Sequence, residues 1–213
     1  MKLPKLYPIV DRATLDARGV SVRDFAREMA QAGVGVLQYR DKAGAPDELL
    51  RAAKEIAAEF AGSGCELIMN DRPDLALLAG WGVHVGHEDL SPGDARKVLG
   101  ARRVIGVSTH NDSQVMEADA SAADYIAIGP VFATATKADT QPVVGLEGVR
   151  RARALTRKPL VAIGGITREN ARSVIDAGAD AVAVIGALLT TGERPGKIAK
   201  DFLEIFAIGN GER

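Results

Sequence analysis

The chain has a single cysteine, Cys65, among its 213 residues. One cysteine excludes an internal disulfide and a cysteine-built metal cage, and it is typical of a protein from a reducing cytoplasm. The three histidines lack the spacing of a zinc motif, so no zinc site is predicted. The chain also lacks a run of roughly 18 apolar residues and an apolar core of signal-peptide length near Met1. We therefore expect a cytoplasmic protein with no membrane partner.

An excess of charge of one sign is also missing. The 27 basic and 28 acidic residues leave a formal net charge of -1, which does not favour nucleic acid or an anionic membrane as a partner. Aromatic residues make up only 4% of the chain while 46% is hydrophobic, which predicts a packed core of small side chains. No linker or low-complexity segment divides residues 1–213, so we predict one domain.

What the chain has instead is a repeated pattern of short apolar runs that end at polar or glycine residues. Such runs are typical of strands buried on both faces, and the amphipathic segments between them predict helices. The predicted strands are 7–11, 36–40, 66–70, 83–86, 104–108, 125–129, 159–164 and 181–185. The predicted helices are 21–32, 47–61, 73–79, 91–99, 111–119, 146–156, 168–177 and 196–206. Ser21, Asp47 and Ser91 are predicted to begin helices.

Eight strand–helix repeats predict parallel strands joined by right-handed crossovers, and they favour a closed (β/α)₈ TIM barrel. An open doubly wound sheet is the alternative. Its dinucleotide-binding version is weakened because no G-x-G-x-x-G motif follows the first strand. Ligands of both folds bind at the carboxyl ends of the strands, where the polar residues of this chain gather. The longest connection, 130–145, is predicted to be an active-site loop.

Gln38, Arg40 and Lys42 alternate at the end of the second predicted strand. Alternate strand residues share a face, so these three side chains can point into one mouth. Arginine offers a planar fork for phosphate oxygens and lysine a compact charge, which together suit a diphosphate. A solvated strand end, with Asp41 paired to its neighbours, is the alternative.

Asp71 and Asp89 end the third and fourth predicted strands. Neighbouring strands lie about 4.8 Å apart, so the two carboxylates can share one cation. Mg²⁺ takes oxygen ligands and keeps water or substrate phosphates in its shell. Helix capping is the alternative for each residue taken singly. The cationic second strand beside the pair favours the metal.

Glycines end the last two predicted strands, at Gly164-Gly165 and at Ile185-Gly186. Phosphate is often bound at this position in such barrels, because glycine lets the backbone approach an anion closely. A tight turn that needs positive φ is the alternative. Thr134 and Thr136-Lys137 add hydroxyls and an ammonium group in the long loop.

The three histidines fall into two groups, one inside a predicted strand and two at strand ends. His84 falls inside an apolar run and is predicted to be a barrel-core imidazole, whereas His87 and His110 follow strands and are candidate substrate contacts.

The motifs occur in the order Gln38-Tyr39-Arg40-Asp41-Lys42, Asn70-Asp71-Arg72, His84-Val85-Gly86-His87-Glu88-Asp89, Gly106-Val107-Ser108-Thr109-His110, Gly129-Pro130-Val131-Phe132 with Thr134-Ala135-Thr136-Lys137, and Ile163-Gly164-Gly165-Ile166. In this order the chain resembles the thiamine-phosphate synthase (thiamine-phosphate pyrophosphorylase) family over about residues 5–205. The resemblance implies a (β/α)₈ barrel and a Mg²⁺-dependent transferase. Such an enzyme joins 4-amino-2-methyl-5-hydroxymethylpyrimidine diphosphate to a hydroxyethyl-methylthiazole phosphate, simple or carboxylated, and releases pyrophosphate and thiamine monophosphate.

The resemblance also implies roles for individual residues. The pyrimidine diphosphate would be held by Gln38, Arg40, Lys42 and Asn70. Asp71 and Asp89 would bind Mg²⁺. Ser108 and Lys137 would contact the pyrimidine or the leaving pyrophosphate, and both would act in catalysis with Arg40 and Lys42. The thiazole phosphate would be bound by Thr134, Thr136, Gly165, Ile185 and Gly186. The substrate-binding set also includes Tyr39, Asp41, Ala135 and Gly164.

Two positions depart from the family pattern: His87 stands where the family often has Gln, and Gly186 where it often has Ser. A thiazole tautomerase-like relative would share the barrel but not the basic triplet or the two aspartates. A non-catalytic thiamine-phosphate sensor is the third reading, although no regulatory domain is visible. A homo-oligomer is a further expectation.

Overall fold

The chain folds into a closed barrel of eight parallel strands in a computed structural model that describes residues 3–134 and 142–207. Each strand pairs with the next, and β1 also pairs with β8, which closes the barrel. The strands are β1 (Leu6–Asp11), β2 (Val36–Arg40), β3 (Glu66–Asn70), β4 (Gly82–Val85), β5 (Ile105–Thr109), β6 (Tyr125–Ile128), β7 (Leu160–Ile163) and β8 (Ala181–Val184). The predicted TIM barrel is confirmed, and the open sheet is excluded.

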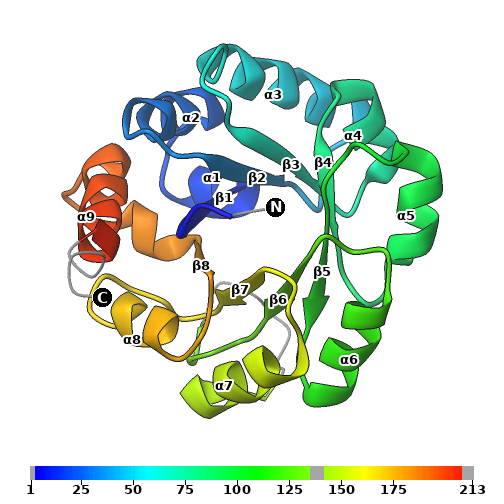
Figure 1. Ribbon diagram of the computed structural model, residues 1–213. Helices are drawn as coiled ribbons and strands as arrows, with labels where there is room; N and C mark the ends of the chain where they lie inside the picture. Colours follow the sequence, from blue (N-terminus) through cyan, green and yellow to red (C-terminus); the bar gives the residue numbers. More distant parts are fainter. Residues whose placement is uncertain (1–2, 135–141, 208–213) are drawn as a thin grey trace.

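An outer ring of helices surrounds the barrel (Figure 1). The ring consists of α2 (Val22–Gln31), α3 (Pro46–Glu59), α4 (Pro73–Ala79), α5 (Pro92–Leu99), α6 (Asp112–Ala120), α7 (Gly145–Leu155), α8 (Ala171–Asp176) and α9 (Pro195–Ala207). Two short elements lie inside it: α1 (Arg12–Ala17), beside β1 and β2, and the 3₁₀ turn η1 (Gly186–Leu189), which follows β8. The eight predicted helices are present, while α1 and η1 were not predicted. In the described part of the chain, no helix is long and apolar enough to cross a membrane.

Side-chain caps explain four of the helix starts, those of α1, α2, α5 and α6. Ser21 and Ser91 accept hydrogen bonds from backbone N–H groups of α2 and α5, as predicted. The prediction for Asp47 is wrong, because α3 begins at Pro46 and its N-cap is Ala45. Proline is favoured at the first helical position, where its missing N–H costs no bond. The prediction for the seventh helix is also too long, since α8 begins only at Ala171.

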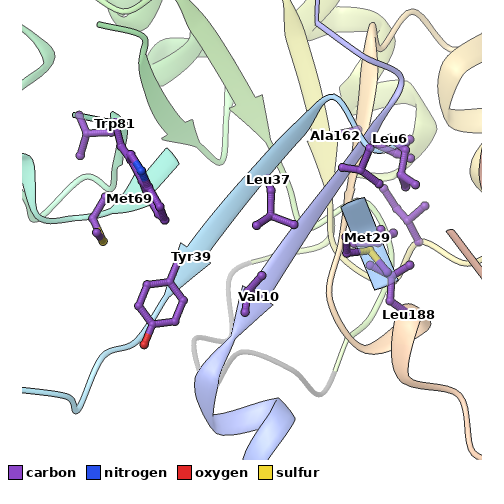
Figure 2. Close-up of a cluster of buried hydrophobic side chains, with 14 of the residues drawn as sticks. Leu6, Val10, Met29, Leu37, Tyr39, Met69, Trp81, Ala162 and Leu188 are labelled. Atoms are coloured by element: carbon purple, nitrogen blue, oxygen red, sulfur yellow. The ribbon is translucent and has the colours of Figure 1, made fainter. Parts of the chain in front are cut away.

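Alternation along the strands divides the core into two layers. One set of side chains fills the barrel, and it includes Tyr7, Ile68 and Tyr125. The other set packs the outer barrel wall against the helices, and Figure 2 shows Val10 and Leu37 there. Because strand side chains alternate with period two, residues next to each other in a motif face different layers.

The first residues of the connection between β6 and α7 lie at the end of β7. The Val131 N–H donates to the Ile163 carbonyl at 2.9 Å, and the Phe132 N–H donates to the Gly164 carbonyl at 3.0 Å. The connection runs over 129–144, in agreement with the predicted loop, and 135–141 lies outside the described residues.

Candidate active site

Two cavities adjoin at the carboxyl ends of the strands. The polar pocket, of about 560 Å³, contains most of the charged candidates, and the glycine-rich pocket, of about 400 Å³, contains the candidates from the last two strands. Ser108 and His110 line both pockets. The polar pocket brings together these predicted residues: Gln38, Arg40, Lys42, Asn70, Asp71, Asp89 and Ser108. The glycine-rich pocket brings together these: Ser108, Thr134, Gly164, Gly165, Ile185 and Gly186.

The basic residues of the polar pocket are held by carboxylates. Arg40 donates to Asp11 at 2.5 Å, and Asp11 also accepts the Thr14 N–H at 2.9 Å as the N-cap of α1. Burial acts to raise the pKa of Asp11, but the hydrogen bonds from Thr14 and Arg40 outweigh it and lower that pKa below its usual value. Asp11 therefore stays ionised and fixes the guanidinium of Arg40 at the pocket wall. The sequence-based site did not include Asp11.

Tyr39 and Asp41 do not line either pocket. The Tyr39 side chain is buried in the helix-facing layer near Val10 and Leu37 (Figure 2), on the opposite face of β2 from Gln38. Its hydroxyl donates to Asp41 at 3.3 Å. Asp41 in turn accepts the backbone N–H groups of the turn before α3. Of these two predicted substrate contacts, the structure places Tyr39 in the helix-facing core and Asp41 in the turn before α3.

Asp71 and Asp89 face each other at the rim of the polar pocket. Neither caps a helix, because the N-caps of α4 and α5 are Arg72 and Ser91. Asp71 is the one non-glycine residue with positive φ, at 61°, among residues 3–134 and 142–207. Backbone strain of this kind gathers at functional sites. Asp89 accepts the Gly86 N–H at 2.8 Å, which orients its carboxylate.

The electrostatics of Asp71 reflect this crowding. Burial raises the pKa of Asp71, the facing Asp89 carboxylate raises it further, and an ion pair with Lys42 opposes both effects. A cation shared by the two carboxylates would relieve the same repulsion. Two hard oxygen donors fit Mg²⁺. Among the described residues, no three His, Cys, Asp or Glu side chains are grouped so that they could hold a metal ion, so water and substrate oxygens would have to complete the coordination shell.

Two tyrosines of the polar pocket were missed in the sequence. Tyr7 and Tyr125 project into the barrel, where their hydroxyls are 2.7 Å apart. His84 accompanies them as a buried imidazole, which confirms the prediction for that residue. The sequence pattern that could have identified Tyr7 and Tyr125 is a polar aromatic residue at an inward-facing position of an apolar strand. His87 and His110 also line the polar pocket, as the strand-end pattern predicted.

The glycines of the second pocket are required by close packing. Gly164 and Gly165 have φ values of 104° and 64°. A Cβ atom at Gly164 would lie 2.6 Å from Pro130, and one at Gly165 would lie 2.6 Å from the Ala133 carbonyl oxygen. The tight-turn interpretation is therefore right for Gly164 and Gly165 and wrong for Gly186, which does not have a positive φ. All three glycines still line the pocket with partly exposed backbone. Of the remaining candidates, Ala135, Thr136 and Lys137 lie outside the described residues.

Comparisons with known proteins agree with this geometry. A family model described as thiamine monophosphate synthase matches residues 6–188. The chain belongs to this family. A thiamine-phosphate synthase of Koribacter versatilis (strain Ellin345) is 50% identical over 208 residues, covering 96% of this chain and 97% of that protein. One from Methanoregula boonei is 43% identical over 185 residues, covering 86% and 85%.

A solved structure of thiamine phosphate pyrophosphorylase from Pyrococcus furiosus superimposes with a TM-score of 0.86 at 31% identity, covering 96% of each chain. The predicted family and the predicted thiamine-phosphate synthase function, a transferase activity, are thereby confirmed. The comparisons do not favour the tautomerase-like and sensor interpretations.

Proposed function

We propose that this thiamine-phosphate synthase family member couples 4-amino-2-methyl-5-hydroxymethylpyrimidine diphosphate to 4-methyl-5-(2-hydroxyethyl)thiazole phosphate, or to its carboxylated form, with the help of Mg²⁺. The products are thiamine monophosphate and pyrophosphate, together with CO₂ where the carboxylated thiazole phosphate is the substrate. The observation that supports this best is the pair of unlike pockets that meet at Ser108. One pocket offers charges for a diphosphate, and the other offers glycine backbone for a second phosphate.

The polar pocket suits departure of the diphosphate. The C–O bond to the pyrimidine methylene breaks, the electron pair leaves with the pyrophosphate, and the electron-rich aminopyrimidine stabilises the resulting cation. Arg40 and Lys42 carry the positive charge that this leaving group needs. Asp71 and Asp89 would hold Mg²⁺, which supplies further charge neutralisation at the leaving oxygens when it is bound.

The glycine-rich pocket suits the nucleophile. Backbone groups near Gly165 and Gly186, with the hydroxyl of Thr134, would bind the thiazole phosphate and aim the ring nitrogen at the pyrimidine methylene. Alignment of two bound substrates can supply much of the rate increase without a protein nucleophile. Roles for Ala135 and Thr136 in substrate binding, and for Lys137 at the pyrimidine or the leaving pyrophosphate, stay predictions, as do a cytoplasmic location and a homo-oligomeric state.

The test is a coupling assay with both purified substrates, with and without Mg²⁺, that measures thiamine phosphate and pyrophosphate together. Equal amounts of both products, formed only with Mg²⁺, are expected. Isomerisation of a thiazole phosphate without pyrophosphate would identify a tautomerase instead. Binding of thiamine phosphate without any turnover would identify a sensor.

A further inference from the structure

A chain of largely buried hydrogen bonds lines the floor of the polar pocket and links five strands. The Gln38 amide nitrogen lies 3.0 Å from the Tyr7 hydroxyl, which is 2.7 Å from the Tyr125 hydroxyl. Tyr125 is 2.9 Å from Nδ1 of His84. Nε2 of His84 is 2.9 Å from Oγ of Ser108. The chain therefore begins at one pocket residue and ends at another.

The first link sets the direction of the whole chain. An amide nitrogen only donates, so the Tyr7 oxygen accepts from Gln38 and its own hydrogen goes to Tyr125. The Tyr125 hydrogen then goes to Nδ1 of His84, which leaves the imidazole proton on Nε2 as the donor to Ser108. Burial raises the pKa of both Tyr7 and Tyr125, so each phenol keeps the hydrogen that this order requires.

Packing holds the links in place. The His84 and Tyr125 rings stack with centroids 5.5 Å apart, and Tyr7 meets Tyr125 edge-on at 5.9 Å. Gly106 leaves the space that the Tyr125 ring occupies, since a Cβ there would lie 2.0 Å from the ring. Each member of the chain is thus confined to the position in which its hydrogen bond forms.

We propose that this buried chain is a one-way relay that fixes His84 as its Nε2–H tautomer and commits the Ser108 hydroxyl hydrogen to an anionic oxygen of the bound diphosphate. The identity of that anion rests on the proposed function. Because the Ser108 oxygen already accepts from His84, its hydrogen is free to face the pockets that meet there. A donor fixed before the reaction stabilises developing charge without reorganisation. Tyr7, Tyr125 and His84 are then positioning residues that act through Ser108.

The tautomer is measured directly in the resting protein by two-bond ¹H–¹⁵N correlation spectra of the histidine rings. His84 is assigned by the loss of its signals in His84→Gln. The Nε2–H form is expected in the wild-type protein. The Nδ1–H form would overturn the proposal, because the chain would then run from Ser108 to Gln38. This measurement needs no turnover, so it can fail while the synthase activity stands, or succeed if that activity is absent.

A matched pair of variants tests the relay further. Tyr125→Phe removes the hydrogen that the Nδ1 atom of His84 accepts, so a mixture of both tautomers is expected. Thr156→Val is the control. Thr156 lies between α7 and β7, away from the two pockets, and its buried hydroxyl donates to Asp119. The His84 signals should be unchanged in the control. Unchanged His84 signals in Tyr125→Phe would also contradict the relay.

A double-mutant cycle separates relay from local packing. Loss of a preorganised donor in Ser108→Ala should lower kcat about 10²-fold, and Tyr125→Phe should lower it about tenfold. In the Ser108→Ala background, Tyr125→Phe should change kcat by less than about twofold, because the relay no longer has an end. If Tyr125→Phe lowered kcat tenfold both in the wild-type protein and in Ser108→Ala, Tyr125 would not act through Ser108 and its role would be structural only. The same cycle can be measured through the Kd for inorganic pyrophosphate, which requires no coupling activity.

Discussion

Lys42 and Asp71 form an ion pair across the rim of the polar pocket, linking the residues that follow β2 and β3. The Asp71 side chain is 14% exposed and the Lys42 side chain 57% exposed, so the pair joins a largely buried acid to an exposed base. The same Asp71 carboxylate faces Asp89. Asp71 therefore lies between Asp89, its proposed partner in binding Mg²⁺, and Lys42, a proposed contact of the diphosphate.

Asp71→Asn should abolish most Mg²⁺-dependent synthesis while the protein stays folded. The amide keeps the size of the side chain but loses the negative charge that a divalent cation requires. Charge stabilisation by a bound metal contributes several kcal/mol to such a transition state, so a loss of about 10²-fold or more in kcat/KM is expected. The measurement is the coupling rate over a Mg²⁺ titration. Asp74→Asn is the matched control and should retain activity, because Asp74 lies in the first turn of α4 and does not line the polar pocket. Full activity of Asp71→Asn would remove this residue from the metal site.

The same substitution should stabilise the metal-free protein at neutral pH. Burial raises the pKa of Asp71 in the fold above the ordinary aspartate value of 3.8, so the unfolded chain loses this proton first as the pH rises. Above the raised pKa the ionised Asp71 carboxylate lowers the free energy of unfolding. This destabilisation disappears as the pH falls below about 3.8. Asn also tolerates positive φ well.

We expect Asp71→Asn to raise the free energy of unfolding by roughly 0.5–1 kcal/mol at pH 7, with the gain vanishing in acid. Urea unfolding at several pH values, with a chelator present, measures it. A loss of stability at pH 7 would mean that the ion pair with Lys42 outweighs the burial of the charge.

The strand ends were predictable because short apolar runs carry a strong signal, and the observed strands begin and end within two residues of the predicted ones. The buried relay was not predictable. Tyr7 and Tyr125 meet across 118 residues, and only closure of the barrel brings them together. Tyr39 shows the opposite difficulty: it lies inside a functional motif, yet the period of the strand turns its side chain away from Gln38.

Lys42→Ala should weaken use of the pyrimidine diphosphate more than binding of the thiazole phosphate. Lys42 lines the polar pocket but not the glycine-rich pocket. Its loss therefore removes a charge-assisted contact worth roughly 1.5–3 kcal/mol to one substrate. A rise of about tenfold or more in KM for the pyrimidine diphosphate is expected, with KM for the thiazole phosphate nearly unchanged. Lys54→Ala, at an exposed lysine of α3, controls for the loss of net charge. Equal effects on both substrates would contradict the division into two pockets.

Gly106→Ala should destabilise the fold and disturb the pocket floor together. A Cβ atom at this position would lie 2.0 Å from Cζ of Tyr125, whose ring is fully buried and cannot move aside freely. Overpacking of this kind typically costs about 1–3 kcal/mol of unfolding free energy, so a clear fall in the urea midpoint is expected. Displacing Tyr125 would also lengthen its contact with Nδ1 of His84 and lower kcat in the folded protein.

Gly93→Ala is the matched control for this substitution. Gly93 lies in α5 with only Ser91 Oγ nearby, 3.7 Å from the added Cβ, and alanine is the better helix former there. This control should be neutral or slightly stabilising and fully active. Gly106→Ala could also unfold at the same urea concentration as the wild-type protein. That result would mean that the barrel interior can accommodate the added Cβ atom next to Tyr125. The rigid placement of the relay would then be wrong.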